Sequence, residues 1–154
     1  MPAPVNFSYP VLLQGSDFEL LAYSWESVIA EKLESIVKFG FINSRMKDFY
    51  DIYFLSLNQS FSAQTLSSAI KHTFENRKTP FNYALIFTDS FINDDDKNNQ
   101  WNAFLNRLQL SSIEFKTVMV KISAFLDPVI KSSNEKIDLN LVWDQHCQKW
   151  SNQI

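Results

Sequence analysis

The amino-acid sequence predicts a predominantly α-helical α+β fold, a helical bundle with a short two-stranded β segment at its N-terminus. Apolar residues recur at helical spacing through most of the chain after residue 24, whereas strand-like alternation is confined to residues 5–23. The 154 residues are 45% hydrophobic, and 14 Phe, 5 Tyr and 4 Trp supply enough apolar material for the core of one domain.

The two predicted strands lie before residue 24. Val5, Phe7 and Tyr9 alternate with polar residues, and residues 18–23 form the second strand after a turn at 14–17. Two strands alone are only marginally stable in water, so we expect them to be the edge of a sheet whose other strands lie elsewhere.

The first two helices are bounded by recognisable capping residues. The first begins after Ser24, whose side chain can cap it, and ends at Gly40. Asn43 or Ser44 is predicted to cap the second helix, which runs to about Leu57.

Three further helices are predicted. Ser62 caps a helix over about 63–77, and its inward-facing residues are Leu66, Ala69, Ile70, Thr73 and Phe74. Residues 81–93 are predicted to be an irregular, aromatic-rich connection, after which Asp94 caps a helix. The inward residues of that helix are Trp101, Phe104, Leu105 and Leu108.

The last helix and the tail complete the predicted organisation. Ser111 or Ser112 opens a long helix, which Pro128 kinks or ends. We assign residues 1–131 to a single helical domain with N-terminal strands. Residues 132–154 are predicted to be a tail docked on that domain, because its tryptophans would otherwise be exposed to water.

Composition excludes several classes of protein. The net charge of −3 and the absence of a basic tail argue against nucleic-acid binding by bulk charge. Cys147 is the single cysteine, which excludes an internal disulfide and a cysteine-based zinc site. No apolar run is long enough for a membrane span and no signal peptide is evident, so a soluble, cytoplasmic protein is expected. The two glycines, Gly15 and Gly40, rule out glycine-rich phosphate loops.

Lys32 is the most informative residue, because it interrupts the apolar stripe of the first helix. That stripe consists of Trp25, Val28, Ile29, Leu33 and Ile36. The other charges of the helix, Glu31, Glu34 and Lys38, are predicted to lie on the opposite side. A lysine that faces the core is costly to bury unless its ammonium reaches water or meets an anion, either a carboxylate or a phosphate.

The second helix supplies carboxylates. Asp48 and Asp51 share one face with the core-type residues Ile52 and Leu55. Two interpretations follow for Lys32 with these aspartates: a phosphate-binding lysine beside acids that support phosphoryl or nucleotidyl transfer, or a structural ion pair between two helices. Arg45 and Lys47 have the same ambiguity, since each can bind phosphate or be a solvated charge.

Other polar groups are assigned structural roles. Residues 94–96 are three aspartates in a row, but their position fits a helix N-terminus, where acids are favoured. His72 is expected at the surface, and no spacing of histidine and cysteine indicates a metal site.

Two segments of the sequence resemble the nucleotidyltransferase AbiEii/AbiGii toxin family. Residues 22–37 carry the family's lysine motif, with Lys32 followed directly by Leu33, and residues 43–53 carry its R-x-K-D-x-x-D motif. The resemblance covers most of residues 5–130. It implies the C-terminal part of a nucleotidyltransferase of the DNA polymerase β-like kind, with the N-terminal strands as a remnant of a sheet that begins before Met1.

The resemblance also implies roles for individual residues. Lys32 would contact nucleotide phosphates, Asp48 and Asp51 would support the catalytic site, and Arg45 and Lys47 would assist in binding substrate. The family's Gly-Gly pair and Asp-x-Asp motif, which hold nucleotide and Mg²⁺, are absent before Lys32. The complete enzyme would use Mg²⁺ and a nucleoside triphosphate, but this chain alone is expected to bind neither tightly and to be inactive.

The expected partners follow from the same resemblance. They are an antitoxin or the missing N-terminal nucleotidyltransferase half, with RNA as a possible acceptor for the complete enzyme. The alternative is a non-catalytic helical module, derived from such an enzyme, that binds another protein.

Overall fold

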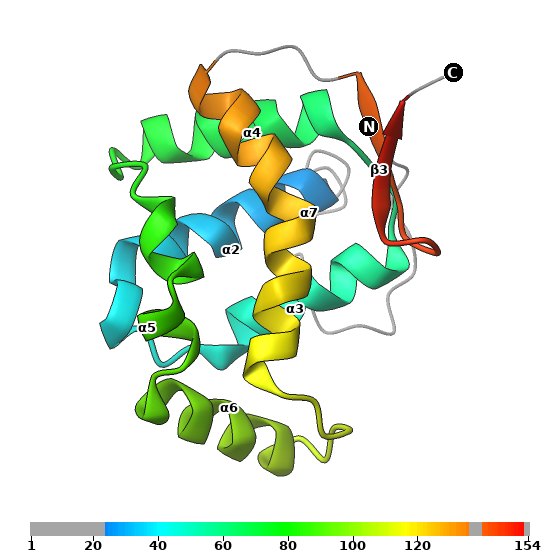
Figure 1. Cartoon of the computed structure of the whole chain (residues 1–154). Helices are drawn as coiled ribbons and strands as arrows, with labels where there is room; N and C mark the ends of the chain where they lie inside the picture. Colours follow the sequence, from blue (N-terminus) through cyan, green and yellow to red (C-terminus); the bar gives the residue numbers. More distant parts are fainter. Residues whose placement is uncertain (1–23, 136–139, 153–154) are drawn as a thin grey trace, which may run out of the picture.

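The structure, a computed structural model, describes residues 24–135 and 140–152. Helices surround one hydrophobic core, and a small antiparallel sheet packs at one side of it (Figure 1). The predicted class, a predominantly α-helical α+β fold, is therefore confirmed. The strands predicted within residues 5–23 lie outside the described residues.

Helix α2 spans Trp25–Phe39 and has both of the predicted caps. The side chain of Ser24 accepts a hydrogen bond from the backbone N–H of Ser27 at 3.2 Å. Gly40 ends the helix with φ of 52°, a left-handed conformation that glycine adopts without steric cost. The chain then continues through a short 3₁₀ helix, η1, over Gly40–Ile42.

Helix α3 spans Met46–Asn58, and its predicted cap is wrong. Arg45 occupies the capping position and its side chain makes no capping hydrogen bond. Asn43 instead folds back locally, and its Oδ1 accepts a hydrogen bond from the N–H of Arg45 at 2.8 Å. Asparagine readily closes such a turn onto the backbone two residues later.

Helix α4 spans Ala63–Asn76 and follows the two-residue strand β1, Phe61–Ser62. The predicted cap is confirmed, since the hydroxyl of Ser62 accepts a hydrogen bond from the N–H of Thr65 at 3.4 Å. The predicted inward residues Leu66, Ile70 and Phe74 are buried, whereas Ala69 and Thr73 are half-buried.

The connection after α4 is more regular than predicted. It contains a 3₁₀ helix, η2, over Tyr83–Phe87 and the one-turn helix α5, Asp89–Ile92. Helix α6, Asp95–Arg107, begins as predicted, because Asp94 accepts a hydrogen bond from the N–H of Lys97 at 3.0 Å. Leu108 lies beyond the end of α6 and is 49% exposed, so its predicted inward position is wrong.

Helix α7 spans Phe115–Glu135. It begins later than Ser111 or Ser112, and the first backbone hydrogen bond joins Val118 N–H to the carbonyl of Glu114 at 3.2 Å. Pro128 lies inside the helix and does not end it. Five apolar residues on the inner side of this helix are buried: Val118, Ile122, Phe125, Leu126 and Val129.

A β hairpin near the C-terminus was not predicted. Strands β2, Leu141–Asp144, and β3, Lys149–Asn152, extend β1 into an antiparallel sheet with the order β1-β2-β3. Trp143 is buried, and its indole N–H donates to the carbonyl of Ser56 at 2.7 Å. The division of the chain at residues 131 and 132 stays a prediction.

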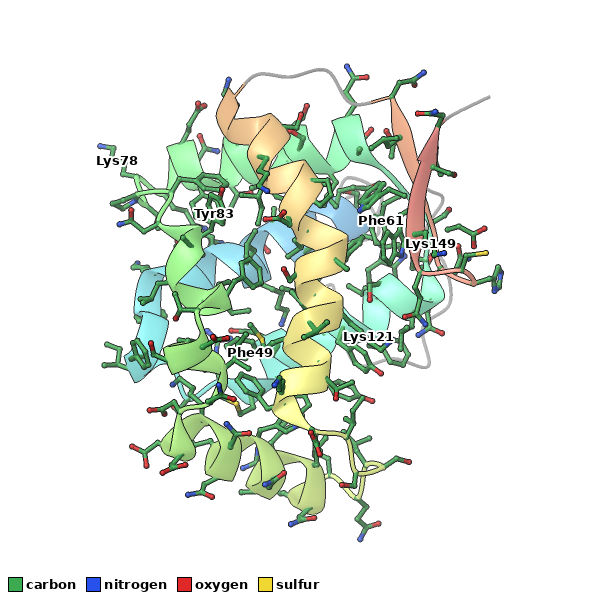
Figure 2. All side chains as sticks on the ribbon, viewed as in Figure 1. Phe49, Phe61, Lys78, Tyr83, Lys121 and Lys149 are labelled. Carbon is green, nitrogen blue, oxygen red and sulfur yellow. The ribbon has the colours of Figure 1, made fainter. Side chains whose placement is uncertain are left out.

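The helices are layered around α2 and α7. Helix α2 packs against α3 and α4, and α7 runs across α3 and α4, with α6 at the far end of the molecule (Figure 1). Phe49 and Phe61 lie within this arrangement, whereas Lys78 extends outward (Figure 2). Within the described part of the chain, no helix combines the length and apolarity needed to cross a membrane.

Candidate functional site

The contact between α2 and α3 places Lys32 against both predicted aspartates. The Nζ atom of Lys32 lies 2.8 Å from Oδ2 of Asp51 and 3.4 Å from Oδ1 of Asp48. Lys32 belongs to the middle of α2, and the two acids lie one turn apart on the face of α3 that packs against it. The sequence spacing therefore predicted the juxtaposition of these three side chains correctly.

The start of α3 adds two more cations. Nε of Arg45 lies 3.6 Å from Oδ2 of Asp48, and Nζ of Lys47 lies 2.9 Å from Oδ2 of Asp51. These pairs have the three- and four-residue spacings at which helical side chains meet. All five predicted site residues thus form one group, here called the Lys32 cluster: Lys32, Arg45, Lys47, Asp48 and Asp51.

The Lys32 cluster has its acids inside and its cations toward water. The side chains of Asp48 and Asp51 are each 1% exposed, whereas those of Lys32, Lys47 and Arg45 are 20%, 44% and 64% exposed. Buried carboxylates of this kind require paired charges, and the cations at the rim provide them. The same cations place positive charge where a ligand would approach from solvent.

Burial and charge act in opposite directions on Asp51. Burial raises the pKa of Asp51 to about 7, because the charged form loses hydration. The two ammonium groups at 2.8 and 2.9 Å favour the charged form and oppose this rise. Burial, and secondly the charge of Lys32, lower the pKa of Lys47, while the charge of Asp48 raises it.

Asp48 has an incompletely satisfied carboxylate. Its Oδ2 is buried and has no hydrogen-bond partner among the described residues. The exposed guanidinium of Arg45 pairs with this oxygen, but its Nε at 3.6 Å is beyond hydrogen-bonding distance.

The donor set of the Lys32 cluster suits an anion better than a metal ion. Three cationic side chains surround two carboxylates, which gives a surplus of positive charge when all five are ionised. Among the described residues, no group of three or more His, Cys, Asp or Glu side chains could hold a metal ion. A divalent cation would be repelled by the surrounding lysines and arginine, so these residues do not fit Mg²⁺. A phosphate group would find charge and donors at the rim.

Lys97 is a polar residue that sequence reasoning missed. It is 1% exposed, and its Nζ donates to the backbone carbonyls of Phe41, at 2.6 Å, and Asn43. Lys97 precedes Trp101 and Phe104 by four and seven residues and therefore shares their buried face of α6. The same signal that identified Lys32, a lysine in an apolar stripe, was present here within a polar run.

Glu34 corrects the prediction for the outer side of α2. It was expected opposite the apolar stripe but is 2% exposed. Its carboxylate accepts a hydrogen bond from Oγ1 of Thr79 at 2.9 Å and pairs with Nη1 of Arg77 at 3.4 Å. The segment after α4 covers this side of α2, which the helical period of α2 alone could not reveal.

Comparison with known proteins identifies the family of the chain. The family model described as nucleotidyl transferase AbiEii toxin, type IV toxin–antitoxin system, matches residues 1–121. No curated protein and no solved structure matches the chain. The matched region includes the whole Lys32 cluster, and membership of a toxin–antitoxin family implies an antitoxin partner. The chain therefore belongs to the nucleotidyl transferase AbiEii toxin family of type IV toxin–antitoxin systems.

Proposed function

We propose that this chain is the C-terminal portion of an AbiEii-type nucleotidyltransferase toxin and that the Lys32 cluster contacts the phosphates of its nucleotide. The observation that carries this proposal is the surplus of cations above two buried carboxylates, with every cation reaching toward solvent. Phosphoryl and nucleotidyl transfer depend largely on positioning and charge neutralisation, which such a group can provide.

Each residue has a role in this proposal. Lys32 contacts phosphate oxygens while it remains bonded to Asp51, because an ammonium group has three donors. Asp48 and Asp51 hold Lys32 and Lys47 in place and support the site. Arg45 can offer two parallel N–H donors to a phosphate, which lysine cannot.

The complete enzyme would require a Gly-Gly pair and an Asp-x-Asp motif, which this sequence lacks before Lys32. A unit with these two motifs would hold Mg²⁺ and part of the nucleoside triphosphate, and the bound Mg²⁺ would supply the metal chemistry. This chain alone would not transfer nucleotides. Its partner would be that nucleotidyltransferase half or an antitoxin, and RNA is the acceptor proposed for the complete enzyme.

Phosphate binding can be tested directly with sodium tripolyphosphate as the probe. We expect a titration followed by NMR to shift the amide signals at the start of α3 and around Lys32. The double variant Arg45→Ala/Lys47→Ala should weaken binding by about a hundredfold, since each lost charge-assisted contact is worth about 1.5 kcal/mol. Lys71→Ala, an exposed lysine on α4, is the matched control and should bind as the parent does. Equal affinity in all three proteins would contradict the proposal.

Inactivity of the chain alone has a separate test. Incubation with labelled nucleoside triphosphates, Mg²⁺ and total RNA should give no incorporation of label. Incorporation that depends on Lys32 would show that the chain is a complete enzyme and would overturn this part of the proposal.

A protein-binding module is the second candidate function. Four large apolar side chains near the end of α2 are exposed: Phe39, Phe41, Ile42 and Leu85. Exposed apolar groups of this kind favour association with another protein. Lys32→Ala separates the two functions, because it should abolish phosphate binding but leave association through these side chains intact.

A further inference from the structure

Lys97 connects helix α6 to the turn between the two helices of the Lys32 cluster. Its ammonium donates to the carbonyls of Phe41 and Asn43, on either side of Ile42. Lys97 is 1% exposed, and its acceptors are neutral carbonyl groups. Burial lowers the pKa of Lys97, although the charges of Asp94 and Asp96 favour the ammonium form. A buried lysine whose head bonds only carbonyl groups is costly, so an apolar residue would fill the same space at lower cost.

The turn that Lys97 holds leads directly into the site. Asn43 receives the lysine at its backbone carbonyl, and its side-chain oxygen accepts the N–H of Arg45 at 2.8 Å. Arg45 precedes the first residue of α3 and faces Asp48 across 3.6 Å. A continuous set of contacts therefore runs from α6 to the first cation of the Lys32 cluster.

Aromatic packing reinforces the same connection. The rings of Phe41 and Phe91 have centroids 5.2 Å apart, and the ammonium of Lys97 lies 5.8 Å from the centroid of Phe91. An ammonium over an aromatic face gains electrostatic stabilisation when it is removed from water. Polar and apolar contacts thus both hold residues 41–43 against α5 and α6.

We propose that Lys97 is a positioning residue for phosphate binding: it fixes the turn at residues 41–43, and so sets Arg45 and α3 against Lys32. The phosphate-binding part of this inference rests on the proposed function of the Lys32 cluster. The geometric part, that Lys97 sets α3 against Lys32, does not. The distances from Lys32 to Asp48 and Asp51 depend on how α3 leaves the turn, since Lys32 and the aspartates belong to different helices. Misplacing a binding group by about 1 Å can reduce its contribution about a hundredfold.

The test uses Lys97→Met, which keeps an unbranched side chain but removes the ammonium. We expect its affinity for tripolyphosphate to fall about tenfold, less than the full loss that misplacement can cause. Lys97→Arg keeps donors for the two carbonyls and should restore part of the affinity. Trp150→Phe is the control, because it removes a comparable bond, from the indole to the carbonyl of Phe125, on the distant strand β3.

A second readout needs no ligand. The titration midpoint of the Asp51 carboxyl, followed by ¹³C NMR, should rise by about one pH unit in Lys97→Met, because Lys32 on α2 no longer stays within contact of Asp51 on α3. Trp150→Phe should leave it unchanged. If the parent chain does not bind tripolyphosphate, the proposed function fails, while this titration still decides whether Lys97 positions the cluster.

A third variant covers the case in which Lys97→Met does not fold. Asn43→Ala keeps the backbone carbonyl that Lys97 binds but removes the bond to Arg45 N–H. It also removes a buried amide nitrogen without a hydrogen-bond partner among the described residues, which favours a folded variant. Asn43→Ala should lower tripolyphosphate affinity or move the Asp51 titration. A folded Lys97→Met or Asn43→Ala protein with both properties unchanged overturns the inference.

Discussion

Helix α2 has two buried charged contacts on different sides, and they differ in how completely their groups are satisfied. Both carboxylate oxygens of Glu34 are engaged, one by Thr79 and the other by Arg77. In the Lys32 cluster, Oδ2 of Asp48 has no hydrogen-bond partner among the described residues. The carboxylate of Glu34 is therefore fully engaged, whereas Asp48 has a hydrogen bond to only one of its two oxygens within the described part of the chain.

The charge excess of the two contacts also has opposite signs. Arg77 pairs with both Glu31 and Glu34, so acids outnumber cations there. In the Lys32 cluster the cations are in excess. An anion is therefore attracted to one side of α2 and repelled from the other, which distinguishes a binding group from a structural one more clearly than burial does.

The largest expected effect is that of Lys32→Met on stability. The variant leaves Asp51 and Asp48 buried without their shared cation, and we expect the free energy of unfolding to fall by about 3 kcal/mol. Urea denaturation of parent and variant measures this difference. A loss below about 0.5 kcal/mol would mean that the lysine contributes as little as a surface ion pair.

Glu34→Gln should cost less than Lys32→Met. The amide keeps the shape of the side chain and an acceptor for Thr79, and it loses only the charge-assisted part of the contact with Arg77. We expect the free energy of unfolding to fall by about 1 kcal/mol. Tripolyphosphate binding should be unchanged, and weaker binding would break the distinction between the two sides of α2.

Asp51 predicts a pH dependence of stability. Its pKa is about 7 in the folded chain and ordinarily about 3.9 in an unfolded one. Between these values the folded state holds a proton that the unfolded state has released. The contribution of Asp51 to stability is therefore full below pH 4 and is lost as the pH rises through 7, by at most about 1.4 kcal/mol per pH unit.

The measurement compares parent and Asp51→Asn in urea at several pH values. Relative to Asp51→Asn, the free energy of unfolding of the parent should fall from pH 5 to pH 7 and then level off. A difference that is flat, or that shifts in favour of the parent, would show that Lys32 and Lys47 keep Asp51 ionised throughout.

Arg45→Ala should have the smallest effect on stability. The arginine side chain is 64% exposed and lies 3.6 Å from Asp48, so its loss should change the free energy of unfolding by no more than about 0.5 kcal/mol. Tripolyphosphate affinity should nevertheless fall about tenfold. A stability loss as large as that of Lys32→Met would place Arg45 in the structural part of the cluster.

Local sequence signals predicted most of the helices. Ser24, Ser62 and Asp94 cap their helices as expected, because a side-chain oxygen next to free backbone N–H groups acts within three residues. The failures at α3 and α7 are also local: Asn43 satisfied a different N–H, and α7 begins at Phe115 rather than after Ser111 or Ser112. The β hairpin was missed because its strands are short and their loop contains no glycine.

The sequence by itself determined the helical class, the family and the membership of the Lys32 cluster, because helical spacing and motif spacing act over a few residues. Only the tertiary structure decided which charges became buried. Glu34 is covered by the segment after α4, and Lys97 is covered by the turn before α3. Contacts between residues more than 40 positions apart depend on how whole helices pack, and no local period of the sequence records that packing.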